Sequence, residues 1–211
     1  MDKNVRLAEI AAEINHFQGL EIARKCTRAV PGEGNPDTEI MFIGEAPGFN
    51  EDLQGRPFVG QAGKLLEKTL SEVLNLQRSD VYITNIVKFR PPENRDPLPD
   101  EIAACKNWLD EQISIISPKV IVTLGRYSLG KFFPDISISQ AHGQLRYADH
   151  EGKRLLIFPM YHPAAALRSG AMMSAFVADF NKLKNFLSIS TGQISSPVIE
   201  NKPALTQQQL F

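Results

Sequence analysis

Four short apolar segments have the length and flanking residues typical of buried β-strands. They span residues 40–43, 81–87, 120–124 and 155–158, and a glycine or proline follows each within four positions. Mostly apolar runs of this length, ended by chain-breaking residues, are typical of strands covered on both faces. The pattern therefore predicts a sheet with layers on both sides.

Between these segments, apolar residues recur three or four positions apart, as they do on one face of a helix. This spacing predicts helices over residues 4–26, 63–76, 99–115, 127–132 and 172–187. Strands that alternate with helices form parallel βαβ units. We therefore predict an α/β fold, namely a three-layer α/β/α sandwich with a central four-stranded parallel sheet.

The pattern ends near residue 188. Residues 189–211 are rich in Ser, Gln, Pro and Asn and poor in large apolar residues until the final Leu210-Phe211. Such a composition cannot bury enough apolar surface to form a core. We expect one domain over residues 1–188, followed by a flexible tail over residues 189–211.

Composition narrows the class of protein. The formal net charge is −1, so any contact with nucleic acid must come from a local basic patch. The chain has two cysteines, no long apolar segment and no apolar core near its start. We therefore expect a cytoplasmic protein without a membrane segment, and nothing in the sequence requires more than a monomer.

Three polar side chains lie within or just after the predicted strands: Glu45, Asn85 and His162. The carboxyl ends of parallel strands meet at one edge of a sheet, where ligands bind. We therefore expect these side chains to converge. The glycine turn over residues 44–48 matches neither phosphate-loop nor dinucleotide patterns, which argues against a phosphate ligand.

Five segments in series resemble the uracil-DNA glycosylase superfamily, most nearly its family 4. They read GEAPGFNEDLQGRPFVGQAGKLL, YITNIVKFRPPENRDP, EIAACKNWLDEQI, ISPKVIVTLG and YHPAAALR. The resemblance implies a DNA repair enzyme that flips deoxyuridine out of DNA and hydrolyses its N-glycosidic bond. Uracil would be released and an abasic site left behind.

The resemblance also implies roles for the residues around the flipped base. Phe58 would stack on the uracil ring, and Asn85 would bond to its O4 and N3–H, a pattern that cytosine reverses. His162 would point at O2, where negative charge builds as the bond breaks.

A carboxylate would assist from the sugar side. Glu45 is the candidate for stabilising the oxocarbenium-like transition state and orienting the attacking water. The best-known branch of the superfamily carries an Asp at the next position, which here is Ala46. Glu51 would lie by the C5 edge of the base, where it would crowd the methyl group of thymine.

The loop over residues 164–168 corresponds to the wedge that enters the gap left by the flipped base. Either Leu167 or Arg168 would fill that gap. Four basic residues are further candidates for contacts with phosphate groups: Lys88, Arg90, Arg95 and Arg168.

Family 4 members usually hold an iron–sulfur cluster on four cysteines, and this chain departs from that pattern. Cys105 matches one ligand, but Phe89 takes the place of another, and the N-terminal pair falls near Phe17 and Leu20. Cys26 is displaced. One ligand of four cannot hold a cluster, so we predict no cofactor and no metal. A metal site that uses Cys26, Cys105 and a histidine stays open.

The last residues, Gln207 to Phe211, resemble the Q-x-x-L-F form of bacterial sliding-clamp-binding peptides, with Gln207, Leu210 and Phe211 as the anchors. Two other functions also stay open. One is a non-catalytic module that binds uracil or damaged DNA, and the other is a glycosylase for hypoxanthine or xanthine.

Overall fold

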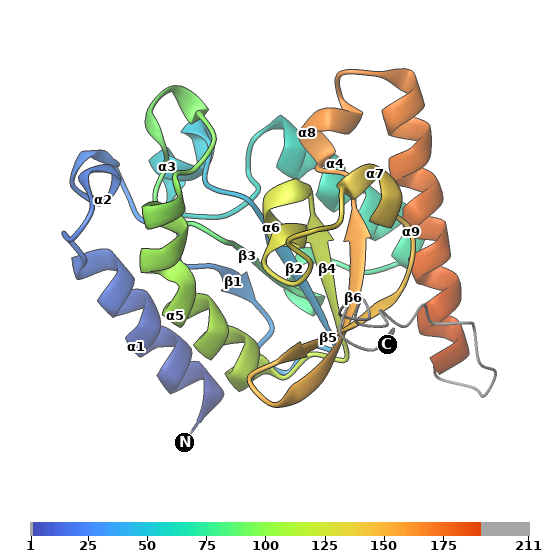
Figure 1. The fold of residues 1–211 in the computed structure, drawn as a ribbon, viewed down its shortest axis with the longest axis horizontal. Helices are drawn as coiled ribbons and strands as arrows, with labels where there is room; N and C mark the ends of the chain where they lie inside the picture. The colour runs from blue at the N-terminus through green and yellow to red at the C-terminus, as the bar shows by residue number, and fades with distance from the viewer. Residues whose placement is uncertain (1, 191–211) are drawn as a thin grey trace, which may run out of the picture.

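The computed structural model describes residues 2–190, which form one six-stranded sheet in the order β1-β3-β2-β4-β6-β5 (Figure 1). The four central strands are parallel, and an antiparallel strand pairs with each edge. The strands are β1 (Glu33–Gly34), β2 (Ile40–Gly44), β3 (Tyr82–Asn85), β4 (Val120–Leu124), β5 (Arg146–His150) and β6 (Lys153–Met160).

The predicted α/β class and the four parallel strands are confirmed, but the sheet is larger than predicted. Strand β1 has two residues, Glu33 and Gly34, and no apolar pattern that could have revealed it. Strand β5 forms a hairpin with β6 through Glu151 and Gly152, whose φ angles are 49° and 75°. A two-residue turn with both φ angles positive suits the twist of a hairpin.

The predicted first helix is broken in the structure. Residues 4–26 form two helices, because Phe17 and Leu20 adopt extended backbone conformations between them. The helices are α1 (Lys3–His16), α2 (Glu21–Lys25), α3 (Phe49–Gln54), α4 (Gln61–Thr69), α5 (Pro99–Ile116), α6 (Arg126–Gly130), α7 (Ile138–Ala141), α8 (Pro163–Ala166) and α9 (Gly170–Ser190), and a π-helical turn over Leu70–Leu74 continues α4.

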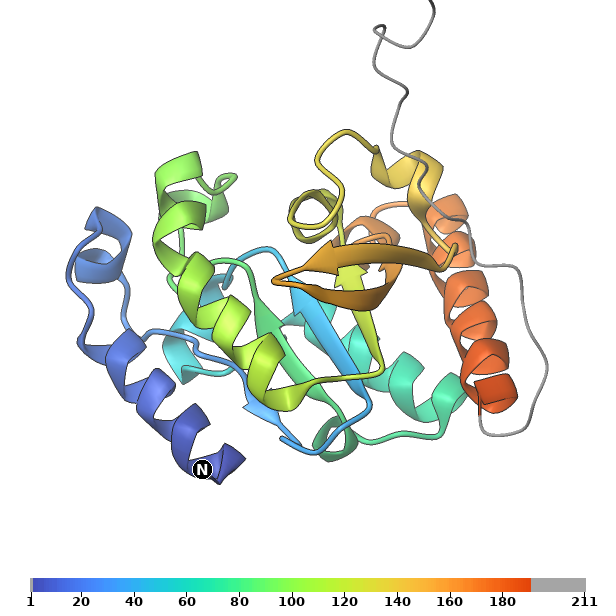
Figure 2. The ribbon, with the colours of Figure 1, turned by 60° about the horizontal axis from the view of Figure 1, so that its bottom comes forward.

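Helices cover both faces of the sheet, because successive side chains of a strand point to opposite faces. On β2, Met41 and Ile43 join the core beneath α1 and α5, whereas Ile40 and Phe42 join the core beneath α4 and α9. Figures 1 and 2 show α1 and α5 side by side, with α9 on the other side of the molecule. The result is a three-layer arrangement.

Short helices gather at the carboxyl edge of the parallel strands, uppermost in Figure 1, where α6 and α8 begin. Among residues 2–190, no helix combines the length and the apolar character needed to cross a lipid bilayer. The predicted tail, with Gln207, Leu210 and Phe211, lies outside the described residues.

Candidate functional site

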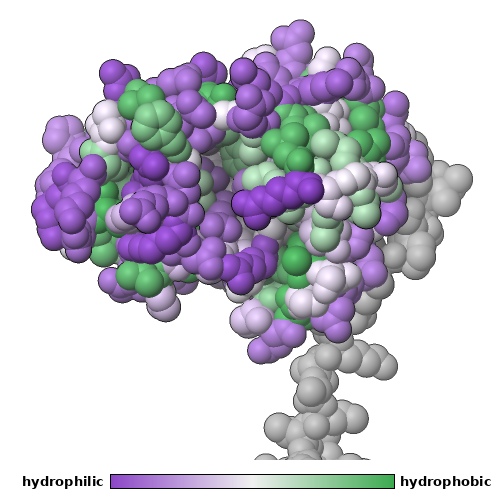
Figure 3. All heavy atoms as spheres, turned by 90° about the horizontal axis from the view of Figure 1, so that it is seen from above, coloured by the Kyte–Doolittle hydropathy of each residue, from purple (hydrophilic) through white to green (hydrophobic). Residues whose placement is uncertain are grey.

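A cleft of about 540 Å³ opens at the carboxyl edge of the sheet. Seen from this edge, the surface is hollowed between two lobes, with hydrophilic side chains around the hollow and hydrophobic ones on both sides (Figure 3). Eight of the predicted site residues line the cleft: Glu45, Ala46, Glu51, Phe58, Asn85, Arg95, His162 and Arg168. The structure thus brings together side chains from segments that are far apart in the sequence.

Phe58 packs deep in the cleft and is only 5% exposed. Its φ of 52° lies in the left-handed region, which non-glycine residues seldom adopt. A Cβ atom on Gly44 would lie 2.5 Å from Cζ of the Phe58 ring, and it would also collide with the Asn85 side chain. Glycine at position 44 therefore allows the ring and the amide to meet at the end of β2.

Asn85 ends β3 directly beside Gly44 and is 2% exposed. Among the residues that the structure describes, none donates a hydrogen bond to its buried Oδ1 atom. An unpaired buried acceptor is unfavourable, and a ligand that supplies a donor removes the cost. The amide therefore presents unused hydrogen-bonding capacity to the cleft.

His162 is fixed as a hydrogen-bond donor toward the cleft. It is the N-cap residue of α8, where its Nδ1 accepts a hydrogen bond from Ala164 N at 3.1 Å. A neutral imidazole that accepts at Nδ1 carries its proton on Nε2. Burial lowers the pKa of His162 to about 4, so the ring is neutral at physiological pH. Its centroid lies 5.6 Å from that of the Phe58 ring.

Glu45 lines the cleft immediately after β2. Its carbonyl oxygen accepts a hydrogen bond from Val87 N at 3.0 Å, which anchors its backbone. Burial, and then the charge of nearby Asp96, raise the pKa of the carboxyl group, while Arg126 opposes the rise. Arg126 itself pairs with Asp96. The cleft thus holds a partly buried carboxyl group, that of Glu45, together with the imidazole of His162.

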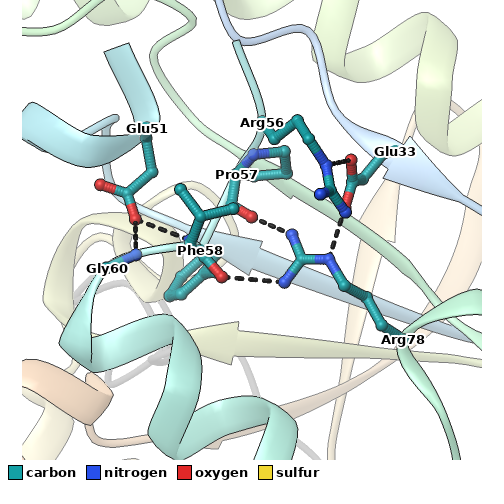
Figure 4. Close-up of polar contacts among 8 residues, drawn as sticks. Glu33, Glu51, Arg56, Pro57, Phe58, Gly60 and Arg78 are labelled. Atoms are coloured by element: carbon teal, nitrogen blue, oxygen red, sulfur yellow. Dashed lines mark hydrogen bonds and ion pairs between the residues drawn. The ribbon is translucent and has the colours of Figure 1, made fainter. Parts of the chain in front are cut away.

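Glu51 holds the loop that carries Phe58. Its Oε1 accepts hydrogen bonds from Val59 N at 2.8 Å and Gly60 N at 2.7 Å (Figure 4). Both bonds are to backbone amides, so this carboxylate has a structural task in addition to lining the cleft. Its predicted place at the C5 edge of the base stays a prediction.

The predicted wedge residues lie exposed beside the cleft. Leu167 is the C-cap residue of α8 and is 48% exposed, and Arg168 follows it. Arg95 makes a two-pronged ion pair with Glu101, with N–O distances of 2.9 and 2.7 Å. Arg90 donates to Asn94 Oδ1 at 2.8 Å. Arg90, Arg95 and Arg168 all keep part of their surface exposed.

The prediction that Lys88 contacts phosphate was wrong. The side chain is fully buried and its pKa is lowered to about 7 by that burial, so it cannot reach a DNA backbone. It braces the segment that ends in Asn85 from within the core. Its Nζ donates to Thr84 Oγ1 at 2.6 Å, to the carbonyl oxygen of Asn85 at 2.8 Å and to Gln112 Oε1 at 2.9 Å.

Sequence reasoning missed several residues at the site. Arg126 follows Gly125 at the end of β4, so the strand-end rule that pointed to the other three side chains would have found it as well. Phe49, the first residue of α3, is 53% exposed, and the Arg90 guanidinium lies 5.0 Å from its ring centroid. An aromatic residue in the polar segment GFNED was the available indication.

The residues at the family's cluster positions do not fit an iron–sulfur group. Phe17 stacks on Phe89 at 5.7 Å between centroids and meets Trp108 edge-on at 5.0 Å. Aromatic rings thus occupy the region where thiolates would be needed. Burial raises the pKa of both Cys26 and Cys105, which disfavours the thiolate form that binds metal.

Cys26 and Cys105 do not meet a histidine in a metal-binding group within residues 2–190. The group of possible ligands that does come together there is Asp110, His150 and Glu151. The carboxylate of Asp110 already pairs with Lys106 at 2.5 Å and with Lys131. Two ammonium groups at this carboxylate oppose the binding of a cation.

Comparisons with known proteins agree with the geometry of the cleft. Residues 31–184 match the family described as the uracil DNA glycosylase superfamily. The chain is 48% identical to a type-4 uracil-DNA glycosylase of Sulfurisphaera tokodaii, over 84% of this chain and 83% of the relative. It is also 48% identical to the Saccharolobus solfataricus type-4 enzyme, over 85% of each chain.

A third relative, the type-4 uracil-DNA glycosylase of Archaeoglobus fulgidus, is 42% identical over 84% of this chain and 91% of its own length. The matched region runs through β2, β3, β4 and β6, and so includes every strand that ends at the cleft. Because both the family match and these identities cover most of the chain, it belongs to the uracil DNA glycosylase superfamily.

Proposed function

We propose that this protein excises uracil from DNA by hydrolysing the N-glycosidic bond of deoxyuridine, as a DNA repair enzyme. Relatives at 42–48% identity are named uracil-DNA glycosylases. The observation that carries the proposal is the meeting of Phe58, Asn85 and His162 in one cleft. An aromatic platform, an amide and a neutral imidazole match the face and edges of a uracil ring.

The base is recognised after it leaves the helix stack. Its ring lies on Phe58, and the Asn85 amide bonds to O4 and N3–H, which gives the buried Oδ1 the donor that it lacks. As the glycosidic bond breaks, negative charge builds on the uracil, and the Nε2–H of His162 bonds to O2. A preorganised donor of this kind lowers the barrier because it does not reorient during the reaction.

Glu45 acts on the sugar side. Its carboxylate stabilises the positive charge that develops on the deoxyribose ring and orients the water that attacks the anomeric carbon. The methyl group of Ala46 cannot do this work, so the task rests on Glu45. The leaving uracil takes the electron pair of the bond, and the water supplies hydroxide to the sugar while its proton passes to solvent.

The acid limb of the pH profile is expected to follow Glu45. Its carboxyl pKa is raised, whereas the pKa of His162 is lowered to about 4, so the acid gains a proton first as pH falls. Steady-state excision should therefore fall while the imidazole is still neutral. Glu45→Gln should be slower throughout and should lose this limb. A limb near pH 6.5, the ordinary histidine value, that persists in Glu45→Gln would contradict the assignment.

DNA lies across the mouth of the cleft. Leu167 or Arg168 enters the gap left by the flipped nucleotide, which stabilises the extrahelical state. On the opposite side, Phe49 offers an exposed ring, and Arg90 packs against it and keeps a positive charge there. Arg95 and Arg168 are the remaining candidates for phosphate contacts, since both line the cleft.

We propose that this chain catalyses the reaction without an iron–sulfur cluster. The aromatic packing of Phe17, Phe89 and Trp108 supports it, because these rings supply apolar contacts in place of a metal centre. Iron content and the visible absorption spectrum of protein purified without oxygen test the proposal directly. Stoichiometric iron together with the visible absorption band of an iron–sulfur cluster would refute the proposal.

A single-uracil oligonucleotide tests the proposed activity. The purified protein is incubated with it, abasic sites are cleaved with alkali, and the products are separated by length. We expect cleavage at the uracil position. Binding without cleavage would instead support a non-catalytic module, and cleavage confined to matched oligonucleotides with hypoxanthine or xanthine would identify a different base.

Deletion of Gln207 to Phe211 is expected to abolish binding to a bacterial sliding clamp and to leave excision from short oligonucleotides unchanged. The Gln, Leu and Phe residues form the anchors of the proposed peptide. Surface-immobilised clamp measures binding, and the oligonucleotide assay serves as the control. Equal clamp binding by the full-length and truncated proteins would rule out this role for the tail.

A further inference from the structure

The loop that carries Phe58 is held from two sides (Figure 4). On one side, Glu51 accepts hydrogen bonds from the amides of Val59 and Gly60. On the other, Arg78 Nη1 donates to the carbonyl oxygen of Phe58 at 2.8 Å, and its Nη2 donates to that of Pro57. One guanidinium therefore binds two consecutive peptide carbonyls at the strained residue.

Arg78 is itself oriented by the edge strand β1. Its Nε donates to Glu33, and its side chain is only 13% exposed. Glu33 also pairs with Arg56 through Nε at 2.7 Å and Nη2 at 2.9 Å. The Arg56 guanidinium contacts only the carboxylate in this network, whereas that of Arg78 contacts both the carboxylate and the carbonyl oxygens of Pro57 and Phe58 (Figure 4).

We propose that Arg78 is a positioning residue that holds Phe58 in its left-handed conformation and so keeps the ring in the cleft as a stacking platform for uracil. A left-handed backbone at a non-glycine residue persists only where its surroundings enforce it. The two carbonyl bonds supply this constraint, because relaxation of φ to negative values would turn the carbonyl of residue 58 away from the guanidinium. The inference rests on the proposed function.

The matched variants are Arg78→Met and Arg56→Met, which both remove a guanidinium that binds Glu33. Only the first removes the bonds to the carbonyl oxygens of Pro57 and Phe58. Competitive inhibition of oligonucleotide excision by free uracil measures the platform separately from the contacts that hold the DNA backbone. We expect Arg78→Met to weaken uracil inhibition about 10-fold, within the range for lost base stacking, and Arg56→Met to leave it unchanged. Equal weakening by both variants would overturn the proposal.

A double-mutant cycle with Phe58→Ala separates positioning from a general structural role. If Arg78 acts through the ring, Arg78→Met should lower kcat/KM in the wild-type background and have little further effect in Phe58→Ala. Arg78→Lys, which keeps one donor nitrogen in place of the two that bind the carbonyls, should restore part of the loss. An Arg78→Met effect of the same size in both backgrounds would contradict the proposal, as would a fall in melting temperature with normal uracil inhibition.

Two controls keep the outcomes distinct. If Arg78→Met does not fold, the same comparison is made between Arg78→Lys and Arg56→Lys, and an equal response of those two refutes the proposal. If the wild-type protein neither releases uracil from DNA nor binds it, the proposed function fails. An active wild type with an unaffected Arg78→Met variant refutes the positioning role alone.

Discussion

Replacement of His162 with alanine is expected to lower kcat for uracil excision about 100- to 1,000-fold, the usual cost of losing one donor to a developing oxyanion. The structure gives this donor a fixed tautomer, because Nδ1 is occupied by the Ala164 amide and the ring is neutral. KM should change much less, since the charge on O2 exists mainly in the transition state.

Single-turnover excision from a uracil oligonucleotide measures this effect on the chemical step. His16→Ala is the matched control, because His16 is exposed on α1, remote from the cleft residues. A His162→Ala variant with unchanged kcat and a raised KM would mean that the imidazole binds the base but does not stabilise the leaving group.

Asn85→Asp is expected to lose uracil excision and to gain excision of cytosine. An amide offers a donor group and an acceptor group, which suit O4 and N3–H of uracil. A carboxylate offers only acceptors, so it repels O4 of uracil and accepts from the N4 amino group of cytosine. Each mismatched hydrogen bond in this buried position should cost about 10- to 100-fold in discrimination. Asn85 is 2% exposed, so water cannot repair the mismatch easily.

Parallel oligonucleotides with one uracil or one cytosine measure the change in preference. Asn181→Asp makes the same substitution at an exposed position on α9 and should leave the preference unaltered. Retained uracil preference in Asn85→Asp would show that another group reads the base edge.

The central part of the fold could be predicted because its four parallel strands are largely buried on both faces and read as mostly apolar runs. The edge strands could not. Residues such as Glu33 and Gly34 pair through their backbone alone, and that pairing leaves no trace in side-chain pattern. The break after α1 was equally hidden, because Phe17 continues the apolar pattern while its backbone is extended.

The strand-end rule located Glu45, Asn85 and His162, since the carboxyl ends of parallel strands share one edge. Charge was a poorer guide. Lys88 is a basic residue beside the site, yet it is buried among polar acceptors, and only three-dimensional packing reveals this. The support of Phe58 by Arg78 was also invisible, because it joins a loop to a residue 20 positions away.

The hydrogen bond between Ala164 N and His162 Nδ1 links helix α8 to the imidazole in the cleft. The bond from Ala164 N to His162 both starts α8 and fixes the imidazole, and the same short helix presents Leu167 at its other end. A displacement of α8 therefore also moves the amide that fixes the ring. In the proposed mechanism, the residue that fills the gap in the duplex and the imidazole that bonds to the departing base lie at opposite ends of one four-residue helix, so DNA bound against Leu167 would set the position of His162.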